Sequence, residues 1–148
     1  MAKEIERKFL VCNDSYRDMA TIRIPILQGY ISRRPEGTVR VRIFGDKAYI
    51  TVKGKNQGCI RSEWEYEIPI ADAQAMLAEV TEGSILEKER LVVPYQGHQW
   101  EIDVFHGRFE GLVTAEIELP DEYETFETPS FIGEEVTGDP RYFNSNLS

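Results

Sequence analysis

The chain has 148 residues and a formal net charge of −9, a length that suits a single domain spanning residues 1–148. The negative charge argues against nonspecific nucleic-acid binding, which depends on a basic surface. No apolar run approaches the roughly 20 residues of a membrane-spanning helix, and the opening MAKEIERK lacks the apolar stretch of a secretory signal. We therefore expect a cytoplasmic protein with no nucleic-acid or membrane partner.

The cysteines and histidines do not suggest a metal centre. Cys12 and Cys59 lie far apart, outside any metal-like spacing, and we expect both to be buried, reduced thiols. His98 and His106 are too few and too isolated for a zinc site.

Alternation of apolar and polar residues recurs along most of the chain and indicates β strands. After the first strand, the polar stretch 13–20 has some helical character, and a helix is expected at 71–80, where apolar residues share one helical face. Gly45-Asp46 fits a tight hairpin turn. The residues after Pro120 are expected to form an acidic loop or helix, and residues 131–148 are expected to form turns that lead into a short C-terminal helix. The strands are expected at 3–11, 24–33, 38–44, 47–54, 60–70, 84–95, 98–106 and 112–120. Such sequential antiparallel strands favour a barrel or a strongly curled sheet.

Charged residues share one face of most of these strands. For any one strand, a solvated polar face is the better explanation. The set differs from ordinary solvated faces because Thr, Ser and Gln are scarce, and because like charges stand two residues apart. Barrel closure would also bring all these faces around one axis. The residues on these faces, strand by strand, are Glu4, Glu6 and Lys8; Arg40 and Arg42; Tyr49, Thr51 and Lys53; Glu63, Glu65 and Glu67; Lys88 and Arg90; Glu101 and Asp103; Glu116 and Glu118.

If the charged faces point inward, the barrel is a tunnel in which like charges repel one another unless a ligand offsets them. Two like charges about 4 to 6 Å apart repel by a few kcal/mol at an effective dielectric constant near 20. Glutamate pairs would be relieved by a hard divalent cation such as Mg²⁺ or Mn²⁺. Arginine and lysine clusters would be relieved by a polyanion, and phosphate matches the guanidinium group. A metal-bound chain of phosphates meets both needs, although this does not by itself name a reaction.

The order of these motifs resembles that of the triphosphate tunnel metalloenzymes, also called the CYTH superfamily. The resemblance runs from residue 4 to about 144. The length and the QGY of residues 28–30 are most similar to the small bacterial members that hydrolyse inorganic tripolyphosphate. The matching segments are the Glu-x-Glu-x-Lys of Glu4, Glu6 and Lys8, RVR at 40–42, TVKG with Lys53, EYE at 65–67, EKER with Lys88 and Arg90, EID with Asp103, AEIEL with Glu116 and Glu118, and the closing GEEVTGDPRYFN.

The resemblance implies an α+β fold: a closed, eight-stranded antiparallel β barrel with a few helices packed outside. It also implies a triphosphate and Mg²⁺ or Mn²⁺ inside the barrel. The implied phosphate-binding residues are Lys8, Arg40, Arg42, Lys53, Lys88 and Arg90. The implied metal ligands are Glu4, Glu6, Glu116, Glu118 and Asp103, although Asp103 could instead form a salt bridge that orients an arginine.

The resemblance further implies catalytic roles for four residues. Glu65 and Glu67 would serve a second metal or orient the attacking water, and Tyr30 and Lys88 resemble a tyrosine–lysine pair proposed for some relatives. Tyr30 could equally be a packed aromatic residue. Glu134, Glu135 and Arg141 either act from the closing segment or belong to a capped C-terminal helix.

The expected activity is metal-dependent hydrolysis of tripolyphosphate to pyrophosphate and orthophosphate. A thiamine triphosphatase, a class IV-type adenylate cyclase and a non-catalytic polyphosphate-binding module remain alternatives, as does a purely structural barrel. A homodimer is compatible with the sequence, which does not determine the oligomeric state.

Overall fold

The structure, a computed structural model, describes residues 3–147. Residues 1, 2 and 148, which belong to the expected single domain, lie outside the described part, as does the last residue of the expected C-terminal helix. Eight long strands form most of the fold: β1 (Lys3–Val11), β2 (Ile22–Arg34), β3 (Gly37–Phe44), β4 (Lys47–Lys53), β5 (Ile60–Ile68), β6 (Glu82–Tyr95), β7 (His98–Phe105) and β8 (Val113–Glu118).

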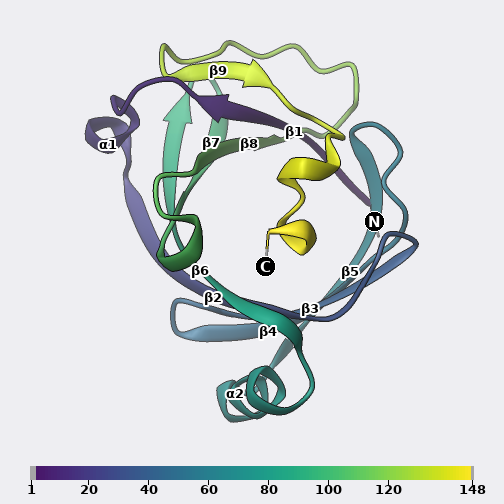
Figure 1. The fold of residues 1–148 in the computed structure, drawn as a ribbon. Helices are drawn as coiled ribbons and strands as arrows, with labels where there is room; N and C mark the ends of the chain where they lie inside the picture. Colours follow the sequence, from purple (N-terminus) through teal and green to yellow (C-terminus); the bar gives the residue numbers. More distant parts are fainter. Residues whose placement is uncertain (1–2, 148) are drawn as a thin grey trace.

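These strands close into an antiparallel barrel, seen end-on in Figure 1. Their order is β5-β4-β3-β2-β6-β7-β8-β1, and pairing of β1 with β5 closes the ring, with Lys3 opposite Ser62. Closure satisfies the backbone groups that an open sheet would leave at its edges. The predicted closed eight-stranded antiparallel barrel is confirmed.

A ninth strand, β9 (Ile132–Glu135), pairs antiparallel with β1 outside the ring. The connection before it covers the outer faces of β1, β7 and β8, where an apolar cluster includes Phe9, Trp100, Ile117 and Phe131. Phe126 packs edge-on against both Phe9 and Trp100. No strand was expected among the turns after residue 131, so β9 corrects that expectation, and the connection that precedes β9 covers the outer face of β1.

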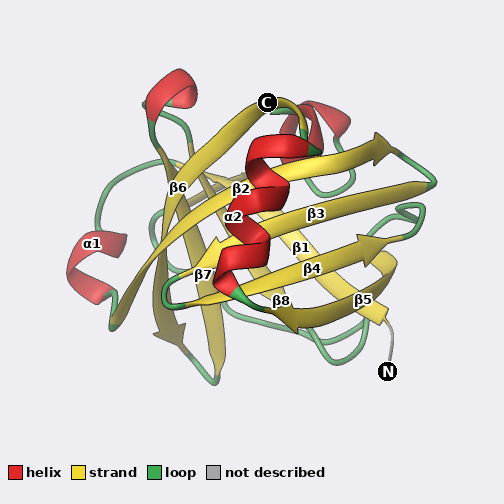
Figure 2. Cartoon of the chain, turned by 90° about the horizontal axis from the view of Figure 1, so that it is seen from below, coloured by secondary structure: helices red, strands yellow, loops and turns green. Residues whose placement is uncertain are grey.

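Helix α2 (Ile70–Glu79) lies across the outside of β3 and β4 (Figure 2). Its buried Ala73 and Leu77 pack against Val41 and Ala48 of these strands. A Cβ on the neighbouring Gly29 would stand 3.1 Å from the side chain of Leu77, so glycine allows this helix to lie close to the wall. Within residues 3–147, no helix is long and apolar enough to cross a membrane.

The remaining helical elements are short turns. The α1 turn (Tyr16–Met19) and η1 (Gly107–Phe109) join strands. The two 3₁₀ turns η2 (Pro140–Tyr142) and η3 (Asn144–Asn146) replace the expected C-terminal helix and lie within the outline of the barrel end in Figure 1. Leu147 packs there against Leu86 and Phe105, so the end of the chain partly covers this opening.

Both cysteines are free, but the expectation that both are buried is wrong. Cys12 is exposed just after β1 ends, and Cys59 is partly exposed in the loop before β5.

Candidate active site in the barrel interior

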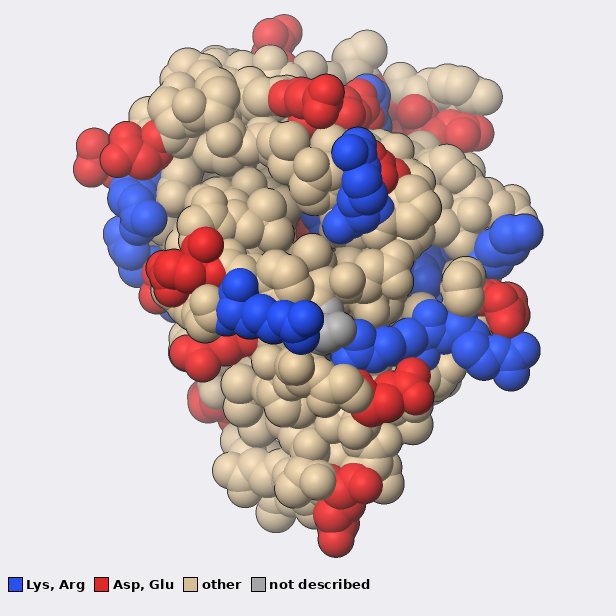
Figure 3. Space-filling model, viewed as in Figure 1, with Lys and Arg blue, Asp and Glu red and all other residues tan. Residues whose placement is uncertain are grey.

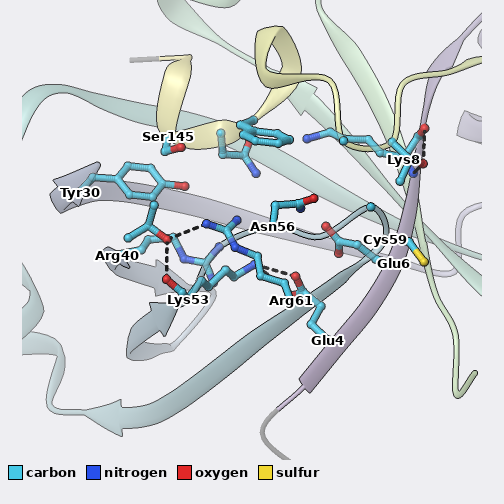
Figure 4. A pocket seen from close by; sticks show the side chains of 16 residues that line it. Glu4, Glu6, Lys8, Tyr30, Arg40, Lys53, Asn56, Cys59, Arg61 and Ser145 are labelled. Carbon is cyan, nitrogen blue, oxygen red and sulfur yellow. Dashed lines mark hydrogen bonds and ion pairs between the residues drawn. The ribbon is translucent and has the colours of Figure 1, made fainter. Parts of the chain in front are cut away.

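Charged side chains point into the barrel and are largely hidden from solvent. Strand alternation turns Ile5 and Phe9 outward into the apolar shell and places Glu4, Glu6 and Lys8 on the inner face of β1. In the view of Figure 3, acidic and basic side chains are spread over the surface and several lie next to one another, and Figure 4 shows those inside the barrel facing each other. The residues that line the central part of the cavity are Glu4, Glu6, Arg40, Arg42, Lys53, Glu63, Glu65, Arg90, Glu101, Glu116, Glu118 and Asn144.

The cations of this cavity come from neighbouring strands. Arg40 and Arg42 stand two residues apart on β3, and Lys53 ends the adjacent β4. Burial, together with the charges of Arg40 and Arg90, lowers the pKa of Arg42 to about 10. Nε of both Arg40 and Arg42 is buried and finds no hydrogen-bond partner in residues 3–147. Two buried donors of the cavity are thus left unpaired by the described residues, which makes them suited to bind an anion.

The carboxylates gather on β1 and β8. The register sets Glu6 opposite Glu118 and Lys8 opposite Glu116. Burial and repulsion by Glu116 and Glu4 raise the pKa of Glu6 well above its ordinary value. Burial would also raise the pKa of Glu116, but the Lys8 ammonium and a hydrogen bond from Glu6 outweigh it and hold that pKa at about 2. Burial and repulsion thus favour the neutral form of Glu6, whereas the charged form of Glu116 is favoured beside Lys8.

This acidic set fits a hard divalent cation. Glu4, Glu6, Glu116 and Glu118 place four carboxyl groups beside two lysines, Lys8 and Lys53, and burial with mutual repulsion raises the pKa of Glu6 and Glu118. Both oxygens of Glu4 accept hydrogen bonds from Lys53 Nζ at 3.1 Å. In the described part of the chain, no three acidic, histidine or cysteine side chains already stand together as a metal site. The donor chemistry thus suits the ion, and in the structure Glu4 and Glu116 pair with Lys53 and Lys8.

Asp103 has a different environment from these glutamates. It is 1 % exposed, and its two oxygens accept hydrogen bonds from Lys88 Nζ (2.7 Å) and from Arg90 Nε (2.8 Å) and Nη2 (3.0 Å). The two cations outweigh the effect of burial and hold its pKa far below the ordinary range. Because both oxygens are engaged, the arrangement favours the salt-bridge alternative for Asp103 over metal ligation.

Lys88 and Tyr30 occupy different parts of the interior. Tyr30 lines the cavity near its C-terminal cover, beside Arg40 and Ser145 (Figure 4). Lys88 is fully buried against Asp103, and burial lowers its pKa to about 8. The register pairs Ile26 with Lys88 and Tyr30 with Glu82, so the two backbones differ by four residues along β2, roughly 13 Å. Within residues 3–147, no hydrogen bond joins the two side chains: the Tyr30 hydroxyl accepts one from Gln28 Nε2 at 3.5 Å, and Lys88 Nζ donates to Asp103.

Strand β5 supplies Glu63 and Glu65 to the cavity, whereas Glu67 is exposed and lies beyond the lining formed by the described residues. Glu63 and Glu101 received no role from the sequence, although the alternation had placed each on a charged face. Burial and repulsion by Glu4 raise the pKa of Glu63 to about 7. Arg61 and Asn144, which also line the interior, had no sequence signal of this kind.

The charged residues of the closing segment point away from the cavity. Glu135 forms an ion pair with Arg7 on the outer face of β1, and Arg141 pairs with Asp139. Glu134 is exposed on β9. The segment reaches the site through its backbone instead, since Lys8 Nζ donates a 2.6 Å hydrogen bond to the carbonyl oxygen of Tyr142.

Comparison with known proteins agrees with this geometry. The family model described as the CYTH domain matches residues 2–143. An inorganic triphosphatase of Acetivibrio thermocellus is 51% identical over 147 residues, covering 99% of this chain and 94% of that protein. An inorganic triphosphatase of Nitrosomonas europaea is 36% identical and covers 98% and 96% of the two chains. The crystal structure of an inorganic triphosphatase superposes with a TM-score of 0.69 at 36% identity, over 97% of this chain and 96% of the other. The chain, with its closed barrel and inward-facing charges, is a member of the CYTH domain family.

Proposed function

We propose that this protein is a metal-dependent triphosphatase that hydrolyses inorganic tripolyphosphate to pyrophosphate and orthophosphate inside its barrel. The observation that carries the proposal is that arginines and a lysine line the same cavity as a larger number of carboxylates. The relatives at 51% and 36% identity, both named inorganic triphosphatases, support the same substrate class.

The basic residues would bind the substrate. Arg40, Arg42, Lys53 and Arg90 line the cavity, and Lys8 reaches it beside the closing segment. Each would donate hydrogen bonds to phosphate oxygens and hold the phosphate chain along the barrel axis. Lys88 would act through Asp103 and Arg90 rather than by direct contact, because it is buried behind the lining.

The acidic residues would hold the cation and the attacking water. Glu4, Glu6, Glu116 and Glu118 would hold Mg²⁺ or Mn²⁺, which supplies positive charge that offsets the charge of the phosphoryl oxygens. Glu63 and Glu65 would orient the attacking water, in place of the predicted Glu65 and Glu67. A carboxylate whose pKa lies near 7, as for Glu63, is suited to accept a proton from that water near neutral pH. The water oxygen would bond to phosphorus as the phosphoanhydride bond breaks. Tyr30 would contact the outer end of the substrate.

A substrate panel tests the proposal. Purified protein is incubated with tripolyphosphate, ATP, thiamine triphosphate or pyrophosphate, each with Mg²⁺ or Mn²⁺, and orthophosphate and cyclic AMP are measured. We expect orthophosphate and pyrophosphate chiefly from tripolyphosphate, and none after EDTA treatment. Formation of cyclic AMP from ATP would show a cyclase instead. Preferential cleavage of thiamine triphosphate would show a thiamine triphosphatase, and binding without turnover would show a polyphosphate-binding module.

A further inference from the structure

The side chain of Thr51 lies midway between an arginine and a glutamate of the cavity. It is fully buried at the centre of β4, on the same inner face as Lys53. The register places Arg40 directly opposite Thr51 on one side and Glu65 directly opposite it on the other. We propose that Thr51 is a positioning residue, whose hydroxyl sets the placement of Arg40 and Glu65 for the phosphate chain. The proposal rests on the proposed function only in taking tripolyphosphate as the ligand.

The directions of the hydrogen bonds are determined by the chemistry of the partners. Arg40 can only donate, and its Nη2 lies 3.2 Å from Thr51 Oγ1. A carboxylate can only accept, so Thr51 Oγ1 donates its proton to Glu65 Oε2 across 2.7 Å. The hydroxyl therefore uses its donor and an acceptor position at once, and both bonds involve a charged partner, which makes them stronger than neutral ones.

The bridge matters because the two charged residues are not on adjacent strands. Arg40 on β3 and Glu65 on β5 are separated by β4, and thus by roughly 10 Å between backbones. The direct contact between Arg40 Nη2 and Glu65 Oε2 measures 3.4 Å, the longest side of the triangle that these groups form with Thr51. A β-branched threonine has few side-chain rotamers, so its hydroxyl provides a fixed point for two longer, more flexible side chains.

This placement leaves part of Arg40 available for substrate. Thr51 and Glu65 engage Nη2 alone, while the buried Nε has no hydrogen-bond partner in residues 3–147. Holding one corner of the guanidinium group turns its other donors toward the cavity, which Arg40 lines. Without the hydroxyl, Arg40 and Glu65 can form a closer pair, which would draw the guanidinium group away from the phosphate.

The chain contains a matched control for this hydroxyl. Thr114 is also fully buried, on β8, but its Oγ1 has no hydrogen-bond partner within residues 3–147. Thr→Val removes a hydroxyl at nearly constant shape at either position. Thr51→Val should therefore impair the site and Thr114→Val should not, although both variants replace a buried threonine in the same barrel.

The test measures affinity and turnover separately. Tripolyphosphate binding is measured by calorimetry in EDTA, and hydrolysis is measured with Mg²⁺ or Mn²⁺, for wild type, Thr51→Val, Thr51→Ser and Thr114→Val. For Thr51→Val we expect affinity and kcat/KM to fall about 10- to 100-fold, the range for losing hydrogen bonds to charged groups. Thr51→Ser, which keeps the hydroxyl, should recover most of the loss, and Thr114→Val should stay within about twofold of wild type. A Glu65→Gln substitution should lose most of its effect when combined with Thr51→Val, since the two groups act together.

Three results would overturn the proposal: wild-type affinity and kcat/KM in Thr51→Val, failure of Thr51→Ser to restore them, or an equal loss in Thr114→Val. Thermal unfolding of each variant shows whether a loss reflects a changed site or a changed fold. If wild type binds tripolyphosphate without hydrolysing it, the proposed function fails while the effect of Thr51 on affinity is still measured. If wild type neither binds tripolyphosphate in EDTA nor hydrolyses it with Mg²⁺ or Mn²⁺, both proposals are wrong.

Discussion

Two groups of acids on the inner face of the same barrel are in opposite electrostatic situations. On β6 and β7, Asp103 is matched by two cations, with Lys88 and Arg90 bonded to its oxygens. On β1, β5 and β8, Glu6, Glu63 and Glu118 lie among other carboxylates, and burial with mutual repulsion raises the pKa of each. The first group is complete within the protein, whereas the second holds charge that the protein leaves unmatched.

The difference separates structural from ligand-binding use of the same residue types. A buried ion pair whose hydrogen bonds are all formed stabilises the barrel wall, because removing one member leaves an unpaired buried charge. A crowded set of carboxylates costs stability and persists where a bound cation offsets the repulsion. Variants in the two groups should therefore differ in whether they affect folding or activity.

The largest loss of stability is expected from Asp103→Asn. The substitution leaves Lys88, whose side chain is 0 % exposed, without its carboxylate and also removes the closer of the two acidic partners of Arg90, the other being Glu101. The free energy of unfolding should fall by about 3–5 kcal/mol, as for other broken buried pairs. Urea unfolding measures it, with Asp46→Asn in the exposed β3–β4 turn as the control. A loss below about 1 kcal/mol would show that the wall does not depend on this cluster.

Glu6→Gln should have the opposite result: lost activity without lost stability. The neutral amide resembles the protonated carboxyl that burial and the neighbouring glutamates favour, so the melting temperature without metal should be equal to or above that of wild type. Hydrolysis should fall about 10²–10³-fold or more, as expected when a preorganised electrostatic group is removed. The stabilisation of wild type by added Mn²⁺ should also be largely lost. A fully active Glu6→Gln variant would remove Glu6 from the proposed metal site.

The pH dependence of stability should also distinguish individual acids. The pKa of Glu63 rises from an ordinary 4.5 to about 7 on folding, so its contribution to stability decreases as pH rises from 4.5 to 7. The pKa of Glu116 falls to about 2, so its contribution is present above 4.5 and is lost as pH falls toward 2.

Urea unfolding in EDTA between pH 4.5 and 8 tests the first of these effects. Glu63→Gln should gain stability relative to wild type as pH rises across this range, because the variant has no carboxylate to ionise. Parallel pH profiles for the two proteins would contradict the raised pKa of Glu63.

The smallest effect is expected outside the barrel, at the ion pair between Arg7 and Glu135. About a third of each side chain is exposed, so water screens the pair. Glu135→Gln should lower the free energy of unfolding by about 0.2–1 kcal/mol and leave kcat/KM unchanged. A large change in activity would instead give the closing segment a direct role in the site.

Local patterns in the sequence predicted which face of each strand carries charge. Alternation with period two depends only on the extended backbone, so Glu4, Glu6 and Lys8 were placed together without knowledge of the partner strands. The helix α2 followed in the same way from its apolar spacing. The strand β9 did not, because its four residues show little alternation and it forms by pairing with β1.

The sequence by itself determined antiparallel strands with one charged face each, and the residue types on those faces. Only the tertiary structure decided which charges share a cavity, which are already paired, and which lie outside. Glu63, Glu65 and Glu67 share one face of β5, yet closure of the ring brings only the first two into the cavity. Asp103 and Glu116 are both buried acids, and only the cross-strand neighbours make one a complete salt bridge and the other part of a crowded carboxylate group. The face on which a side chain lies is set by the local backbone. The partners of that side chain depend on strand register and on closure of the barrel, which bring together residues far apart in the chain.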